Sequence, residues 1–157
     1  LLAEHLRSLT AATGAELWVA GDADLAAAVG AEAVHLAAAD PWPDAVDGLR
    51  RGRSCHSPGE LQAAERAGAD HATYSPVFTT PSKPGYGPPL GLDGLAAGCR
   101  VVPGLAVVAL GGIGPGRARA CVEAGAAAVA LMGAVMGAQD PATVVRSVAD
   151  EVRRATT

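Results

Sequence analysis

The sequence predicts an α/β fold in which parallel strands are covered by helices. Short apolar runs rich in Val, Ala and Leu alternate with longer segments of helical period, a pattern typical of repeated βα units. Helices such as Pro58–Ala67 and Pro115–Ala124 are expected to connect the strands. Six strands are expected, at Glu16–Ala20, Ala33–Leu36, Arg53–His56, Ala72–Phe78, Ala106–Leu110 and Ala128–Met132. An open doubly wound sheet and a closed barrel both satisfy this pattern.

A weak internal repeat supports the unit boundaries. Gly-Ala pairs at positions 30, 68 and 125 each end a helical stretch immediately before a strand, and glycine suits the left-handed position that ends a helix. The first nine residues, LLAEHLRSL, predict an amphipathic helix and not a signal peptide.

Length and composition narrow the class of protein. A chain of 157 residues, half of them apolar, fits one domain over residues 1–157 with a sizeable core. The three scattered cysteines indicate neither a disulfide framework nor a zinc knuckle, so a reducing cytoplasm is the expected location. The longest apolar runs are too short to cross a bilayer, and a net charge of -4 with 3% aromatic residues argues against nucleic acid. The expected ligand is a small molecule.

Two glycine-rich turns predict an anion pocket. The segment Val107–Gly116 reads VVALGGIGPG, a buried strand entering a turn at Gly111 and Gly112, and Gly133 follows the next strand. Exposed backbone N–H groups at such turns and at the following helix start favour phosphate, although a tight turn without a ligand has the same sequence. Because phosphate sites in barrels recur after the last two strands, the pair of turns favours phosphate. The pattern is not the dinucleotide fingerprint G-x-G-x-x-G.

The loop Thr79–Gly91 carries further candidate ligands. Thr80, Ser82 and Lys83 lie after the longest expected strand and can hydrogen-bond and neutralise a phosphate or diphosphate. On the residues alone, a solvated surface loop is an equally good interpretation.

These segments together resemble a known family. SCHSPGELQAAERAGADHATYSPVFTTPSKPGYGPPLG, VVALGGI and GAAAVALMGAV closely resemble thiamine-phosphate synthases and thiazole tautomerases, over residues 16–145. The resemblance implies a (β/α)8 TIM-type barrel, which decides between the two sheets. Synthases join an aminopyrimidine diphosphate to a thiazole phosphate and release pyrophosphate with Mg2+, whereas tautomerases isomerise the thiazole phosphate without a metal.

The resemblance also assigns roles. Thr80, Ser82 and Lys83 match the family's T-x-[ST]-K, which contacts phosphate and pyrophosphate groups. Gly111 and Gly112 match the phosphate-binding turn, and Gly133 stands where synthases usually carry serine. Ser54 matches an active-site serine, so it joins Lys83 as a catalytic candidate. Asp40 matches a magnesium-binding aspartate, and carboxylate oxygen is a preferred Mg2+ ligand.

The sequence departs from the family at several positions. Ala20-Gly21 stands where synthases carry Asn-Asp, with Asp22 one residue away, and Pro76 stands where tautomerases place their acid/base histidine. His35 and His56, at strand ends, are weak replacements. His71 is expected before its strand, and Cys55 is expected in the core because it points opposite to Ser54.

Six strands instead of eight imply a barrel without its first two strands, and without the Gln-x-Arg-x-Lys segment that binds the pyrimidine diphosphate. The open edges invite pairing with another chain, so the expectation is a fragment of a longer product or a homo-oligomer. The first functional hypothesis is a thiamine-phosphate synthase. The alternatives are a thiazole-phosphate tautomerase, or an inactive homologue that binds a phosphorylated ligand.

Overall fold

The computed structural model describes residues 2–44, 48–80 and 88–157. Its centre is a six-stranded sheet in which all strands are parallel and follow one another in chain order. The strands are β1 (Trp18–Ala20), β2 (Ala33–Leu36), β3 (Arg50–Cys55), β4 (His71–Tyr74), β5 (Ala106–Leu110) and β6 (Ala128–Ala130).

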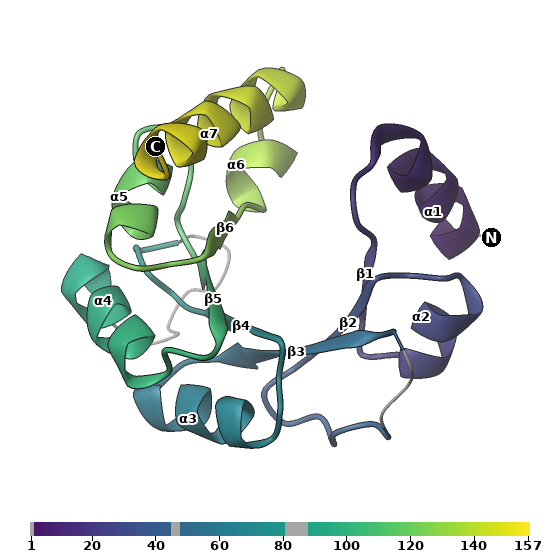
Figure 1. The fold of residues 1–157 in the computed structure, drawn as a ribbon. Coiled ribbons are helices and arrows are strands. Elements are labelled where there is room, and N and C mark those ends of the chain that lie inside the picture. Colours follow the sequence, from purple (N-terminus) through teal and green to yellow (C-terminus); the bar gives the residue numbers. More distant parts are fainter. Residues whose placement is uncertain (1, 45–47, 81–87) are drawn as a thin grey trace.

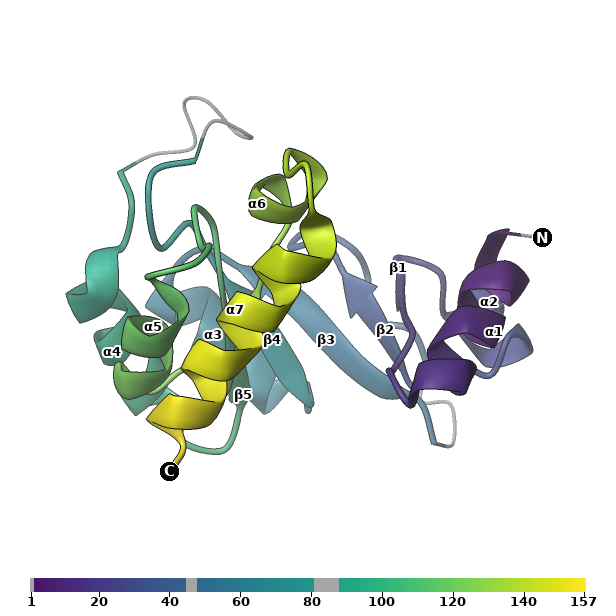
Figure 2. The ribbon, with the colours of Figure 1, turned by 90° about the horizontal axis from the view of Figure 1, so that it is seen from above.

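In the described ranges, seven helices accompany the sheet: α1 (Leu2–Thr13), α2 (Ala23–Ala28), α3 (Pro58–Arg66), α4 (Gly91–Val101), α5 (Ala118–Glu123), α6 (Gly133–Met136) and α7 (Pro141–Ala155). Figure 1 shows the sheet curling inside an arc of helices, with an opening between α1 and the α6–α7 pair. In the view from above, α6 lies at the same end of the sheet as the turn after β5 (Figure 2). The expected barrel without two of its strands is therefore confirmed as a curled half-barrel.

Four strands differ in their bounds from the prediction. β1 begins at Trp18, two residues after the expected start, and β6 ends at Ala130, two residues before the expected end. β3 begins at Arg50, three residues before the expected start, and pairs there with Ala33 of β2. The charged residues Arg50 and Arg51 interrupt the apolar pattern that predicts a strand. Arg50 lies at the rim of the sheet, where its guanidinium contacts the carboxylate of Glu16 at 2.5 Å. β4 covers His71–Tyr74 and stops short of the expected Phe78, because Pro76 has no N–H to donate to a neighbouring strand.

The Gly-Ala repeat marks the unit boundaries as expected. Gly30, Gly68 and Gly125 all adopt positive φ, at 65°, 75° and 104°, directly after helices α2, α3 and α5. Glycine adopts this left-handed conformation without the steric cost that a Cβ would bring.

The main core lies between the sheet and helices α3, α4 and α5. Leu61 of α3 and Leu95 of α4 are fully buried against Tyr74 of β4. Gly98 of α4 allows this approach, since a Cβ there would lie 2.4 Å from the Tyr74 ring. Cys55 is fully buried in the same cluster, as predicted, and burial raises the pKa of its thiol to about 11.

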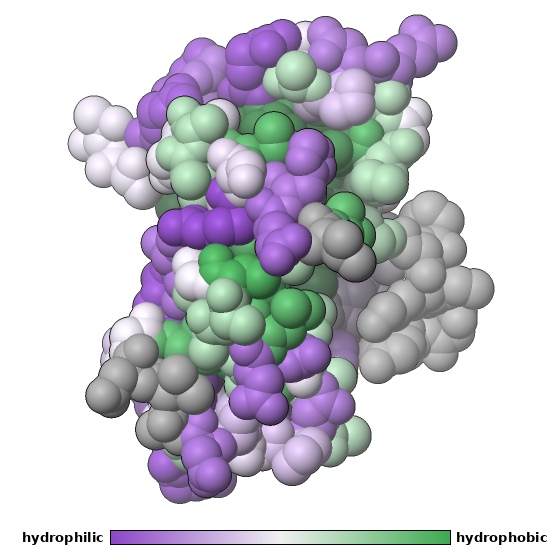
Figure 3. All heavy atoms as spheres, turned by 90° about the vertical axis from the view of Figure 1, so that its right-hand side faces the viewer, coloured by the Kyte–Doolittle hydropathy of each residue, from purple (hydrophilic) through white to green (hydrophobic). Residues whose placement is uncertain are grey.

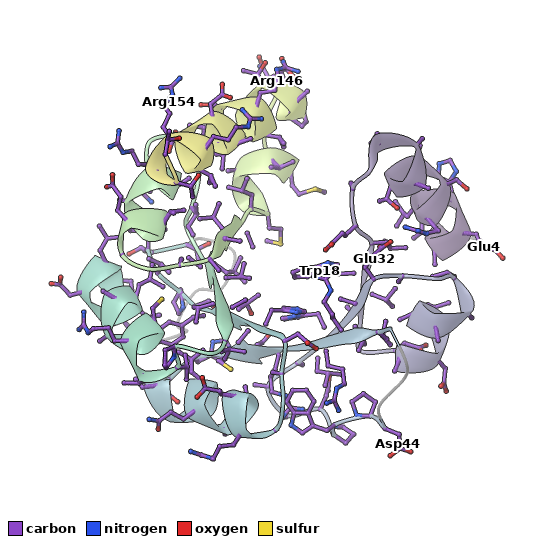
Figure 4. The ribbon with its side chains drawn as sticks, in the orientation of Figure 1. Glu4, Trp18, Glu32, Asp44, Arg146 and Arg154 are labelled. Atoms are coloured by element: carbon purple, nitrogen blue, oxygen red, sulfur yellow. The ribbon has the colours of Figure 1, made fainter. Side chains whose placement is uncertain are left out.

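The expected N-terminal helix forms as α1, and none of its residues is buried. Leu2, Leu6 and Leu9 stay exposed, and Figure 3 shows hydrophobic side chains among hydrophilic ones on the side that carries α1 and α2. Glu32, labelled in Figure 4, holds α1 through an ion pair with Arg7 at 2.8 Å. Within the described residues, every helix falls short of the length and hydrophobicity that crossing a bilayer requires.

Candidate functional site

A cavity opens at the carboxyl ends of β4, β5 and β6. Its volume is about 540 Å³, within the range of small-molecule sites. The lining residues come from the loops that follow these strands: Ser75, Pro76, Thr79, Thr80, Leu110, Gly111, Gly112, Ile113, Gly114, Pro115, Arg117, Ala130, Met132, Gly133 and Ala134. Four predicted ligands, Thr80, Gly111, Gly112 and Gly133, thus share one cavity, which we call the glycine pocket.

The two glycines after β5 are required by the packing of the pocket wall. Gly111 and Gly112 have φ values of 101° and 65°. A Cβ on Gly111 would lie 2.7 Å from Cα of Pro76, and one on Gly112 would lie 2.6 Å from the carbonyl oxygen of Thr79. The loop after β4 therefore lies directly against the glycine turn, and two main-chain hydrogen bonds, from Val77 and Phe78, fix it there.

The hydrogen bonds of the turn leave its amides available. The carbonyl oxygens of Leu110 and Gly111 accept from the N–H groups of Val77 and Phe78, at 2.9 and 3.0 Å. Within the described residues, no hydrogen bond uses the N–H of residues 112 to 114. A cavity wall with available N–H donors and without a carboxylate is suited to an anionic ligand.

The N–H groups at the start of α5 are not available to an anionic ligand, contrary to the sequence prediction. The helix begins at Ala118 and not at Pro115. Its first N–H groups are occupied by Glu151 of α7, whose carboxylate accepts from Gly116 at 2.6 Å, Ala118 at 3.1 Å and Arg119 at 3.4 Å. The anion at this helix start is thus a side chain of the protein itself.

The pocket also contains a charged residue that the sequence pattern does not predict as a ligand. Arg117 lies in the turn before α5, and its Nη1 donates to the carbonyl oxygen of Gly112 at 2.7 Å. The predicted start of α5 at Pro115 had placed this arginine inside a helix, so its position beside the glycine turn was concealed. The predicted ligands Ser82 and Lys83 lie outside the described residues.

Ser54 belongs to a polar cluster on the inner face of the sheet and not to the glycine pocket. Its Oγ lies 3.1 Å from Nε2 of His35, and Oγ1 of Thr73 lies 3.5 Å from the same nitrogen. Nδ1 of His35 lies 3.1 Å from Nε2 of His71, and the ring of Trp18 packs on His71 with centroids 4.1 Å apart. Trp18 points from β1 toward the inside of the arc (Figure 4).

Burial in this cluster favours the neutral form of both imidazoles. Burial, followed by the charges of His35 and Arg50, lowers the pKa of His71 to about 4, and burial also lowers the pKa of His35. His71 was expected to precede its strand. It is instead the first residue of β4, and only 4% of its surface is exposed.

Asp40, the predicted magnesium ligand, lies in the loop after β2. Its Oδ2 accepts from the N–H of Ala37 at 2.8 Å, and the residue lines a separate cavity of about 370 Å³ together with Gly21. A Cβ on Gly21 would lie 3.9 Å from the same carboxylate oxygen. Asp22 does not fill this gap, because its Oδ1 accepts from the N–H of Leu25 and caps α2.

Among the described residues that line this second cavity, Asp40 therefore provides the one carboxylate. Within the part of the chain that the structure describes, no three His, Cys, Asp or Glu side chains gather as a ready metal centre. Arg53 holds the Asp40 loop by donating from Nη2 to the carbonyl oxygen of Asp40, and its guanidinium lies 4.2 Å from the Trp42 ring centroid.

The chain is similar to known proteins over most of its length. The family described as thiamine monophosphate synthase matches residues 1–135. The chain belongs to this family. It is 44% identical to the thiamine biosynthesis bifunctional protein ThiM/ThiE of Symbiobacterium thermophilum, with 98% of the chain and 33% of that protein covered. It is 42% identical to a putative thiamine-phosphate synthase of Geobacter sulfurreducens, with 89% of the chain and 68% of that protein covered.

The fold agrees with this assignment. Thiamine phosphate pyrophosphorylase from Pyrococcus furiosus matches with a TM-score of 0.87 at 31% identity, over 99% of the chain and 76% of that structure. The chain thus spans only a third of the bifunctional relative and about two thirds to three quarters of the other two proteins.

One more histidine of this thiamine monophosphate synthase family member lies near the glycine pocket. Nδ1 of His56 lies 3.0 Å from the carbonyl oxygen of Ser75 and 3.3 Å from its Oγ, and Ser75 lines the pocket. The neighbouring lining residue is Pro76, whose side chain has no proton to transfer. A histidine is therefore near the pocket, but one residue back from its wall.

Proposed function

We propose that this chain acts in thiamine biosynthesis as a transferase of the thiamine-phosphate synthase class, joining an aminopyrimidine diphosphate to a thiazole phosphate with release of pyrophosphate. The glycine pocket carries this proposal. It supplies free turn amides and a side-chain cation at the strand ends, and the family match supplies the substrate class.

In this proposal the phosphate of the thiazole sits in the glycine pocket. The N–H groups of residues 112 to 114 and the hydroxyl of Thr80 serve as donors, and Gly133 also lines the pocket. Ser82 and Lys83, three residues or fewer beyond Thr80, are proposed to reach the diphosphate.

The reaction then needs mainly positioning and charge. The carbon–oxygen bond between the pyrimidine methylene and the diphosphate breaks, and pyrophosphate leaves with the bonding electrons. The lone pair of the thiazole nitrogen forms the new carbon–nitrogen bond. Lys83 is proposed to stabilise the departing charge, and Ser54, held by His35, to orient the pyrimidine at the inner face of the sheet.

The proposed magnesium site fits the residues present only in part. Mg2+ is commonly held by one or two carboxylates together with substrate phosphates and waters. Asp40 provides one carboxylate beside a cavity, so the remaining oxygens would come from the diphosphate and water. When bound, the ion would supply positive charge against the leaving pyrophosphate.

The test is direct. The purified chain is incubated with both substrates and Mg2+, and thiamine phosphate and pyrophosphate are measured. Thr80→Val is expected to weaken thiazole phosphate binding, because it removes a hydroxyl donor at nearly constant volume. Binding of thiazole phosphate without product formation would contradict the synthase activity and leave the inactive binding homologue.

A thiazole-phosphate tautomerase is the second candidate, favoured by the contact between His56 and Ser75. It would need no metal and would isomerise thiazole phosphate without the pyrimidine substrate, so proton exchange into the thiazole measured by NMR distinguishes it. His56→Gln should abolish such exchange and leave the synthase reaction intact.

Location and assembly are part of the same proposal. Three free thiols, Cys55, Cys99 and Cys121, are compatible with a reducing cytoplasm. Within the described residues β1 and β6 each pair with one neighbour only, so a homo-oligomer formed over these edges is proposed, and its mass by light scattering would test it.

A further inference from the structure

The glycine pocket carries its positive charge on one side. Among its described lining residues Arg117 is the only charged one. The wall after β6 offers no hydroxyl or cationic side chain, because its lining residues are Ala130, Met132, Gly133 and Ala134. Any side-chain charge that meets a ligand from the described residues must therefore come from the wall that contains Arg117.

Arg117 is held at the junction of two loops. Its Nη1 donates to the carbonyl oxygen of Gly112 at 2.7 Å, and its guanidinium carbon lies 4.8 Å from the centroid of the Phe78 ring. The first contact ties it to the turn after β5, and the second to the loop after β4. A guanidinium fixed in this way loses less conformational freedom when it binds an anion.

The charge of Arg117 is not neutralised by a carboxylate among the described residues. The nearby Arg119 behaves differently, because its Nε pairs with Glu123 at 2.7 Å. Glu151, the other acid near this turn, is engaged with main-chain N–H groups. A guanidinium has five N–H donors, and the contact with Gly112 uses one of them.

We propose that Arg117 is a phosphate-binding residue that recognises the dianionic phosphate monoester in the glycine pocket. This inference rests on the proposed function and deepens it, because it names the group that selects a phosphorylated thiazole over the free alcohol. Arginine forms charge-assisted hydrogen bonds with phosphate, and the adjacent free amides of residues 112 to 114 complete the set of donors.

Calorimetry with the full chain tests the proposal. Three ligands are titrated: inorganic phosphate, hydroxyethylthiazole phosphate and unphosphorylated hydroxyethylthiazole. Arg117→Gln can still donate to the carbonyl oxygen of Gly112 but has no charge, whereas Arg117→Lys keeps the charge. Arg119→Gln is the matched control, because it removes an arginine two positions away that lies outside the pocket lining. Circular dichroism verifies that each variant folds.

The expected result is a loss of thiazole phosphate affinity of roughly ten- to a hundredfold in Arg117→Gln. A smaller loss is expected in Arg117→Lys, and no change in Arg119→Gln or toward the unphosphorylated thiazole. If Arg117→Gln bound thiazole phosphate with wild-type affinity, the proposal would be overturned, and Arg117 would have only a structural role.

The phosphate titration separates this inference from the proposed function. If the wild-type chain binds inorganic phosphate and Arg117→Gln does not, the role of Arg117 stands even where thiazole phosphate fails to bind better than phosphate. Thiazole phosphate binding no better than inorganic phosphate would instead contradict the proposed function, in which the thiazole is the ligand. If the wild-type chain binds neither phosphate compound, both proposals are overturned.

Discussion

Nδ1 of His35 lies 3.1 Å from Nε2 of His71, and the two imidazoles stack with centroids 5.2 Å apart. One nitrogen must donate and the other accept, so two protonated rings would direct two N–H groups into the same gap. At most one ring can therefore carry a charge in the folded chain. The lowered pKa values of both histidines agree with this geometry.

The first prediction concerns stability in acid. The pKa of His71 is about 4 in the folded chain and is ordinarily near 6.5, so between these values the unfolded chain binds a proton that the folded chain does not. The free energy of unfolding should therefore fall as pH drops from about 6.5 toward 4. The contribution of His71 is about 1–3 kcal/mol. Urea denaturation followed by circular dichroism at several pH values measures it.

Two variants isolate this effect. His71→Phe keeps an aromatic ring beside Trp18 but cannot titrate, so its stability should decline less between pH 6.5 and 4. A smaller decline should remain, because the pKa of His35 is lowered too. His5→Gln, on an exposed position of α1, should follow the wild-type curve. Equal declines in wild type and His71→Phe would refute the assignment.

The second prediction concerns Gly52, which makes room for the His71 ring. A Cβ at this position would lie 1.9 Å from Nε2 of His71. The His71 ring cannot move away from this Cβ without losing its contacts with Trp18 and His35. Gly52→Ala should therefore lower the free energy of unfolding by more than about 2 kcal/mol.

Gly59 provides the opposite case for the same substitution. It lies in the first turn of α3, and a Cβ there would meet nothing within 4 Å. Gly59→Ala should raise the free energy of unfolding by about 0.5–1 kcal/mol, because alanine favours the helix. If both alanine variants were neutral, the close packing inferred around His71 would be wrong.

The sequence predicted the fold well where strands are apolar and less well where they are not. The bounds of Ala33–Leu36 and Ala106–Leu110 agree with the structure, because most residues of these two runs are apolar and buried. Arg50 and Arg51 at the start of β3 do not fit the apolar pattern that predicts a strand, although their backbone pairs with β2. The side chain of Arg50 is partly exposed at the rim of the sheet. Charge at a sheet rim thus conceals a strand from a hydrophobicity pattern.

The candidate site likewise contains residues that could be predicted from the sequence and residues that could not. Gly111, Gly112, Gly133 and Thr80 could be predicted to meet because the carboxyl ends of parallel strands share one edge of the sheet, and they do line one pocket. The role of Glu151 could not, because it acts on a turn 35 residues earlier in the chain and no local pattern signals that contact. Long-range capping of this kind requires the three-dimensional structure.

The third prediction follows from that contact. Glu151→Gln keeps the shape of the side chain but removes the negative charge that three main-chain N–H groups share. We expect the free energy of unfolding to fall by about 1–2 kcal/mol. Amide hydrogen exchange should also accelerate at Gly116 and Ala118. Asp150→Asn is the control, because its ion pair with Arg153 is exposed and should contribute little. Equal effects of the two variants would argue against the cap.

The last prediction concerns the incomplete magnesium site. Gly21 lies beside Asp40, where a Cβ would be 3.9 Å from the carboxylate, and a second carboxylate there would complete a two-acid site. Gly21→Asp should therefore strengthen Mg2+ binding by at least about tenfold in calorimetry without substrate. The φ of Gly21 is 73°, a left-handed value that aspartate and asparagine tolerate better than most residues.

Gly21→Asn separates charge from backbone strain, because it imposes the same conformation without the negative charge. It should leave Mg2+ binding at the wild-type level, where one carboxylate holds the ion only weakly until a diphosphate brings further oxygens. Adding pyrophosphate should therefore raise the Mg2+ affinity of the wild-type chain more than that of Gly21→Asp. Equal Mg2+ affinities of the aspartate and asparagine variants would mean that Asp40 does not face a metal position at all.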